Sequence, residues 1–256
     1  MQPSPFRFFA LVFALTVPFW VFAGRPLPIP VRLPASAAAL VTPMLAALIL
    51  TQRRGGWAGV RQLFSRVLDF RRMQNRAWLA PVLLLNPVIY LLAYAAMRLA
   101  GRPLPDPQVP WLLAPVFLLA FFAAAVGEEL GWMGCACEPL EARWGALRAG
   151  LLLGVVWAVF HLVPDLQNEQ TAGWIFWHRL TTVSLRVLIV WVYNNTGKSL
   201  FSALLFHAMS NVCWTLFPNY GSHYDPLFVG ALTLLATAAV LIIYEPRTLA
   251  RLRFGG

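Results

Sequence analysis

Several side chains that can transfer a proton, carry charge or donate a hydrogen bond lie inside stretches of sequence that are otherwise apolar. Among them are His178 and Arg179, of which we expect His178 to be interfacial, and seven candidates for a functional site. The seven candidates are Glu128, Glu129, Trp157, His161, Arg186, His207 and Asn211. An ionisable side chain in lipid costs roughly 2.5 to 3.5 kcal/mol on insertion scales, so it usually faces a protein interior or a water-filled cavity. Carboxylates and imidazoles act as general acids and bases, and imidazole and amide N–H groups stabilise an oxyanion. The set therefore predicts proton-transfer chemistry within a membrane.

Glu128 and Glu129 are adjacent, so they point about 100° apart on a helix and cannot both face the same target. We expect one to act and the other to support it. Two carboxylates this close in a low dielectric do not both ionise readily, so one should exchange a proton near neutral pH, as a general base must. The alternative is a helix end that has left the membrane with both glutamates solvated.

The histidines stand at helical spacing from a second functional side chain. Trp157 and His161 share a helix face, so the indole could wall a pocket that orients the imidazole. His207 and Asn211 also share a face and could donate hydrogen bonds to one oxygen. The alternatives are an interfacial histidine at 161 and a polar clamp between helices at 207 and 211.

The elements that carry these residues are predicted to be membrane helices. The 256 residues are 59% apolar and 12% charged, with a mean hydropathy of +0.66, whereas soluble domains carry about 25% charged residues. Stretches long enough to cross a bilayer, without the alternation of barrel strands, must be helices. Eight occur, at about 6–23, 34–51, 77–97, 111–133, 148–164, 174–193, 199–217 and 226–244. The predicted fold is all-α, a polytopic transmembrane helical bundle forming a single domain over residues 1–256.

Basic residues in the short connections predict the orientation of the bundle. The connection 52–76 holds seven arginines and only one acidic residue, Asp69, so we expect it to be cytoplasmic, with both termini on the same side. Within it, residues 57–72 have apolar residues at helical spacing and predict an amphipathic helix in the interface, with an ordinary basic loop as the alternative. The net charge is +10, and the basic residues that produce it lie between apolar stretches rather than along one polar face. The expected partner is therefore the lipid bilayer and not nucleic acid.

Three short motifs resemble those of the CPBP family of intramembrane proteases, which contains the Ras-converting CAAX prenyl endoprotease and the bacterial abortive-infection-like proteins. The motifs are Glu128-Glu129-Leu130-Gly131-Trp132, Trp157-Ala158-Val159-Phe160-His161 and His207-Ala208-Met209-Ser210-Asn211. The stretch 191–200, which leads into the third motif, is also similar to the family. The resemblance covers about residues 110–215, which we take as the catalytic core.

The resemblance implies an endopeptidase of the CAAX-processing or bacteriocin-processing type. Glu128 and His161 would activate water, and His207 and Asn211 would stabilise the oxyanion, with Glu129 and Trp157 in support. The family pattern implies a site without a cofactor or metal. Two histidines and a glutamate are also a known zinc ligand set, so zinc stays an alternative. The expected substrate is a peptide or a membrane protein, and the expected location is the bacterial inner (plasma) membrane.

Two features of the chain depart from this pattern. The family's arginine four positions after the second glutamate is replaced by Met133, and we hypothesise that Arg186 supplies the missing charge to Glu129. If the chain turns near residue 140, Glu128 and His161 also differ by roughly 13 Å in depth at 1.5 Å per residue. The alternatives to an active peptidase are an inactive membrane scaffold or immunity protein and a proton-coupled transporter.

Overall fold

The computed structural model describes residues 4–22, 35–108, 110–216, 221 and 223–253, and this part of the chain is helical without strands. The predicted bounds at residues 23, 34 and 217 lie outside the described residues. The helices are α1 (Pro5–Val21), α2 (Thr42–Ser65), α3 (Leu79–Leu99), α4 (Ala114–Gly131), α5 (Glu138–Trp144), α6 (Ala146–Gln167), α7 (Ala172–Asn195), α8 (Leu200–Leu216) and α9 (Pro226–Ile243). The all-α prediction is confirmed.

The helices have the length and surface of a membrane protein. Five described segments are long and apolar enough to cross a bilayer: α3 with the turn before it, α4 through α5, α6, α7 and α9. The apolar helices α1 and α8 are shorter. Large apolar side chains face outward, including Leu119 on α4 (73% exposed) and Leu235 on α9 (64% exposed), as expected where lipid surrounds the protein. The count of eight spans stays a prediction.

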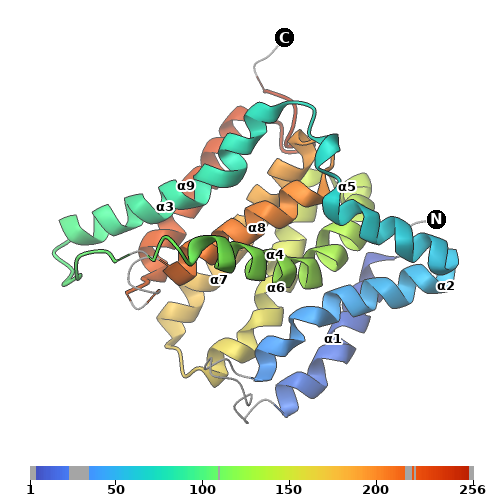
Figure 1. Cartoon of the computed structure of the whole chain (residues 1–256), viewed down its shortest axis with the longest axis horizontal. Helices are drawn as coiled ribbons and strands as arrows, with labels where there is room; N and C mark the ends of the chain where they lie inside the picture. The colour runs from blue at the N-terminus through green and yellow to red at the C-terminus, as the bar shows by residue number, and fades with distance from the viewer. Residues whose placement is uncertain (1–3, 23–34, 109, 217–220, 222, 254–256) are drawn as a thin grey trace.

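The ends of the helices fall into two groups. In Figure 1 the start of α1, the end of α2 and α5 lie to the right of centre, at about mid-height, whereas α1 ends at the bottom and α3 ends at the far left. This separation is what alternating passages through a bilayer require. Which group faces the cytoplasm stays a prediction.

The span that carries the glutamate pair is longer than expected. It runs from α4 through a π-helix, Trp132–Cys137, into α5, and ends only at Gly145, whose φ of 81° breaks the helix. The assumed turn near residue 140 is therefore wrong. Glu128 lies 17 residues before Gly145 and His161 lies 16 residues after it, so antiparallel α4 and α6 bring both to a similar depth. Because the chain turns at Gly145 rather than near residue 140, the predicted difference in depth between Glu128 and His161 disappears.

Close backbone approaches hold α4 and α6 against their neighbours. A Cβ atom on Gly131 would lie 2.5 Å from the carbonyl oxygen of Pro43 in α2, and one on Gly154 would lie 2.9 Å from the Cα of Val183 in α7. Both distances are too short for a side chain. Glycine at these positions therefore allows α2 to pack on α4 and α7 to pack on α6.

We expect Gly131→Ala to destabilise the protein by about 1 to 3 kcal/mol, because the added methyl group must push α2 away from α4. Thermal unfolding in detergent measures this change. Gly173→Ala is the matched control, since a Cβ there would meet nothing within 4 Å. Equal melting temperatures for the two variants would contradict the packing account.

The basic connection after the first half of α2 differs from the predicted helix 57–72. α2 bends at Gly56 (φ 58°), continues to Ser65, and is followed by 3₁₀ turns at 66–68 and 70–72. The helix is interrupted at Asp69, whose backbone has φ −82° and ψ 32°, and the side chain of Asp69 bonds to the start of α8. Its Oδ1 accepts hydrogen bonds from Ser199 Oγ (2.9 Å) and Phe201 N (3.0 Å) at the start of α8. The helical prediction is right for 57–65 and wrong for 66–72.

Candidate active site

Glu129 is the centre of a buried cluster that draws on three helices. Its Oε2 lies 2.5 Å from Arg186 Nη1 of α7, and its Oε1 lies 2.8 Å from His207 Nδ1 of α8. Glu129 and Arg186 are fully buried and His207 is 2% exposed. The hypothesis that Arg186 lies beside the glutamate pair is confirmed by this contact. The functional role of each residue stays a prediction.

Glu128 joins the same cluster through Trp157 of α6. The indole Nε1–H donates to Glu128 Oε2 at 2.5 Å. The Trp157 ring also packs under the Arg186 guanidinium, 4.1 Å from its centroid, and against the His207 ring at 5.1 Å. Trp157 therefore connects the two glutamates that the helix geometry points apart, and it orients the Glu128 carboxylate.

His161 lies one helical turn beyond Trp157, at the edge of the cluster. Its ring contacts the rings of Trp157 and Phe160 at 5.5 and 5.0 Å. Its Nδ1 lies 2.9 Å from the carbonyl oxygen of Trp157, and because a carbonyl only accepts, Nδ1 must carry the proton. In the neutral ring Nε2 is then an acceptor, which is the form that takes a proton from water.

Two motif positions contribute less than the resemblance implies. Asn211 is half-buried on α8, one turn after His207, and makes no hydrogen bond to a described residue. Met133 is fully buried in the π-helix, four residues after Glu129. The structure thus brings Glu128, Glu129, Trp157, Arg186 and His207 into direct contact. It leaves His161 and Asn211 beside them.

The cluster balances its charge when His207 is protonated. Two buried carboxylates face one guanidinium and one imidazole, and a buried ion is tolerated only with compensating partners. Because His207 Nδ1 donates to Glu129, its Nε2 carries a proton only in the imidazolium form. An imidazolium at 207 both neutralises the cluster and offers an N–H donor at Nε2. This combination suits the stabilisation of an oxyanion.

A second polar layer, which the sequence analysis did not anticipate, lies next to the cluster. Asp165, one turn after His161, is 2.8 Å from Arg179 Nε of α7. His178 Nδ1 lies 2.9 Å from the Tyr224 hydroxyl. The spacing of Asp165 from His161 was the available signal, because both lie on one face of α6. The Asp165–Arg179 ion pair joins α6 to α7 one helical turn beyond His161.

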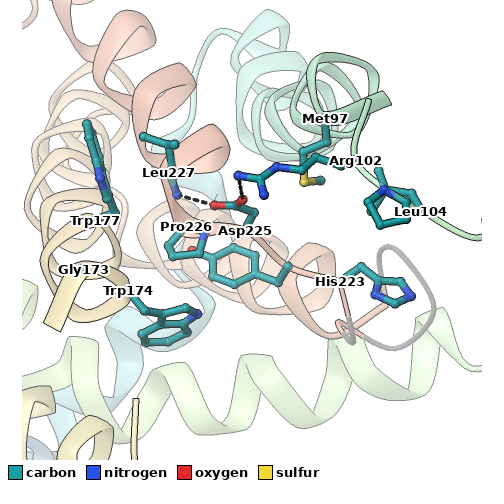
Figure 2. A pocket seen from close by; sticks show the side chains of 12 residues that line it. Met97, Arg102, Leu104, Gly173, Trp174, Trp177, His223, Asp225, Pro226 and Leu227 are labelled. Carbon is teal, nitrogen blue, oxygen red and sulfur yellow. Dashed lines mark hydrogen bonds and ion pairs between the residues drawn. The ribbon is translucent and has the colours of Figure 1, made fainter. Parts of the chain in front are cut away.

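Two surface pockets lie away from the predicted catalytic residues. The pocket in Figure 2, of about 410 Å³, is formed where α3 ends and α7 and α9 begin, and its rim includes the Arg102–Asp225 ion pair. His223 lines it. A second pocket, of about 440 Å³, is lined by residues such as Glu141, Lys198 and Arg247 near α5 and the end of α7. Neither pocket contains a residue of the cluster.

The described residues offer no cluster of ligands typical of a metal site. Among them, no three His, Cys, Asp or Glu side chains converge as a metal ion would require. Glu129 Oε1 and Oε2 are both occupied, by His207 and Arg186.

Residues 110–213 match the family model described as type II CAAX prenyl endopeptidase Rce1-like, so over this range the chain is similar to membrane peptidases of the CAAX prenyl endopeptidase class. The matched range contains all seven side chains predicted from the sequence. CAAX prenyl protease 2 of Methanococcus maripaludis is 24% identical over 222 residues, which cover 81% of this chain and 80% of that protein. The resemblance stated from the three motifs is confirmed.

Proposed function

We propose that the protein is an intramembrane endopeptidase in which Glu128 and His161 activate water and His207 stabilises the oxyanion. One observation carries the proposal: side chains from α4, α6, α7 and α8 form a buried cluster of two carboxylates, a guanidinium and an imidazole. Residues 110–215 would form the catalytic core within a single domain. The cytoplasmic membrane of a bacterium is the proposed location.

The first step is the attack of water on the scissile carbonyl carbon. Glu128 accepts one proton of the water, and its hydrogen bond from Trp157 holds the carboxylate in place. His161 Nε2 is free to accept the other hydrogen bond of the same water. The carbonyl oxygen becomes an oxyanion. It accepts a hydrogen bond from His207 Nε2–H and a second one from the Asn211 side-chain amide. Preorganised donors of this kind contribute about 2.7 to 4 kcal/mol each.

The second step breaks the C–N bond. The tetrahedral intermediate collapses, the proton held by Glu128 passes to the departing amine, and the other product is a carboxylic acid, which then loses its proton to water to give a carboxylate. The charge of the cluster rises by one when Glu128 is protonated, and the oxyanion offsets this change. The balance between Glu129, Arg186 and His207 is therefore needed throughout the reaction.

The substrate is proposed to be a peptide held at the membrane, either lipid-modified near its carboxyl terminus or inserted in the bilayer. Incubation of the purified protein with an S-farnesyl-cysteine peptide bearing three further residues, and separately with an unmodified peptide library, tests this. Mass spectrometry should find new termini with wild type and not with His161→Ala. Activity should persist in the presence of a chelator. Absence of cleavage for every peptide would contradict the proposal, and loss of activity that zinc restores would contradict the metal-free mechanism.

A further inference from the structure

The segment from Arg53 to Arg76, here called the basic segment, has an outer surface of arginines and large apolar side chains. Its exposed arginines include Arg53, Arg61, Arg71 and Arg76. Its exposed apolar residues are Trp57 (73%), Phe64 (42%), Leu68 (66%) and Phe70 (54%). Water alone does not stabilise such a surface, whereas the boundary between headgroups and acyl chains accommodates both kinds of side chain.

The bend in α2 places this surface at one end of the bundle. After Gly56 the helix turns back, and in Figure 1 its second half runs from the far right of the view toward α5. Val60 and Leu63 are buried. A Cβ on Gly134 of the π-helix would lie 3.0 Å from Leu63 Cδ1. One face of the basic segment therefore packs on the span that carries Glu128 and Glu129, and the other face points outward.

The polar residues that are turned inward join the basic segment to the other catalytic helices. Arg66 donates to the Tyr193 hydroxyl of α7 and, at 3.3 Å, to Glu138 of α5. Asp69 binds Ser199 and the first turn of α8, the helix that carries His207. The only acidic side chain of the basic segment is thus used internally, and the outer surface is strongly cationic.

We propose that the basic segment binds anionic phospholipid headgroups and that this binding stabilises the arrangement of α4, α7 and α8 around the cluster. Charge complementarity selects the lipid class, because guanidinium groups bind phosphate oxygens in bidentate geometry and an anionic leaflet attracts them. The exposed aromatic side chains fit the same interface. A zwitterionic headgroup offers phosphate without net charge and should bind more weakly.

The test is native mass spectrometry of the purified full chain, titrated with phosphatidylglycerol or with phosphatidylcholine. The test variant is Arg61→Gln/Arg71→Gln/Arg76→Gln. The control is Arg143→Gln/Arg148→Gln/Arg251→Gln, which removes the same charge from exposed residues outside the basic segment. Phosphatidylglycerol binding should fall by about 100-fold in the test variant, since each arginine near an anionic surface contributes about a fivefold preference. Equal losses in the two variants, or equal binding of the two lipids by wild type, would overturn the proposal.

The effect on the catalytic helices rests on the proposed function and has its own readout. Cleavage of the S-farnesyl-cysteine peptide in vesicles should increase several-fold when phosphatidylglycerol replaces a third of the phosphatidylcholine. The increase should be lost in the test variant and kept in the control. If wild type binds phosphatidylglycerol selectively but cleaves no peptide in either vesicle, the proposed function fails and the lipid site stands. If cleavage is present but independent of the lipid, the coupling to the helices is wrong.

Discussion

Replacing Glu128 with glutamine is expected to lower the rate of peptide cleavage by about 10²- to 10⁴-fold, the usual contribution of a general base. The amide keeps the shape of the side chain and still accepts the hydrogen bond from Trp157 Nε1. It cannot take a proton from water. The reaction should therefore lose its chemical step while the substrate still binds, so kcat falls and KM changes little.

The control for this result is Glu141→Gln, which changes a glutamate of α5 that bonds Lys198 and Asn194 rather than the cluster. Its activity should stay within a few-fold of wild type. Both variants should unfold near the wild-type temperature in detergent. A Glu128→Gln protein that is folded and as active as the Glu141→Gln protein would remove Glu128 from the mechanism.

Replacing Arg186 with methionine is expected to reduce kcat by about 10²- to 10³-fold, comparable to the loss of one oxyanion donor. Arg186 touches no substrate atom in the proposed mechanism and acts as a positioning residue. Without it Glu129 keeps only His207 as a partner, and the cluster loses one of its two cations. The Glu129 carboxylate is then fixed at one oxygen only, so the His207 ring that it binds loses its fixed orientation toward the oxyanion. Breaking a buried ion pair also costs about 3 to 5 kcal/mol of stability.

A second substitution separates positioning from a simple loss of stability. Met133 occupies the position at which the family resemblance implies an arginine, one turn after Glu129. The double variant Met133→Arg/Arg186→Met should have a kcat at least tenfold higher than that of Arg186→Met alone. Met133→Arg alone should lower activity, because it adds a third cation to a balanced cluster. A double variant that regains thermal stability without regaining kcat would show that Arg186 serves the fold only.

The residues of the site could be predicted because membrane burial makes polar side chains conspicuous. Glu128, Glu129, His161 and His207 were identified by their apolar surroundings and by i,i+4 spacing, without knowledge of the fold. The pairing of Arg186 with Glu129 was a hypothesis from the family resemblance, because Met133 replaces the arginine that the family pattern implies near the second glutamate. The structure places these two groups in contact.

The path of the chain between the motifs could not be predicted in the same way. The π-helix and α5 continue the span that carries Glu128 and Glu129. No residue of 132–144 has a positive φ, and the first that does is Gly145, where the helix ends. Hydropathy does not report such a dihedral angle. The bend at Gly56 has a signal in the Gly55–Gly56 pair, but its direction depends on the packing of Leu63 near Gly134.

The polar layer beside His161 was missed for a related reason. Asp165 lies near the end of α6 and His178 near the start of α7, where polar residues are usually solvated at the interface. Their pairing with Arg179 and Tyr224 is a tertiary contact between separate segments. Only coordinates reveal that these side chains are shielded by neighbouring aromatic rings such as Trp174.

The most direct test of the central claim, that the buried cluster hydrolyses a peptide bond with activated water, is cleavage in water enriched in ¹⁸O. The S-farnesyl-cysteine peptide is incubated with purified wild-type protein, and the product that carries the new carboxyl terminus is weighed by mass spectrometry. We predict one ¹⁸O atom in that carboxylate for wild type and no product above background for Glu128→Gln. Cleavage by the Glu128→Gln protein at the wild-type rate would contradict the mechanism, as would a wild-type product that contains no ¹⁸O.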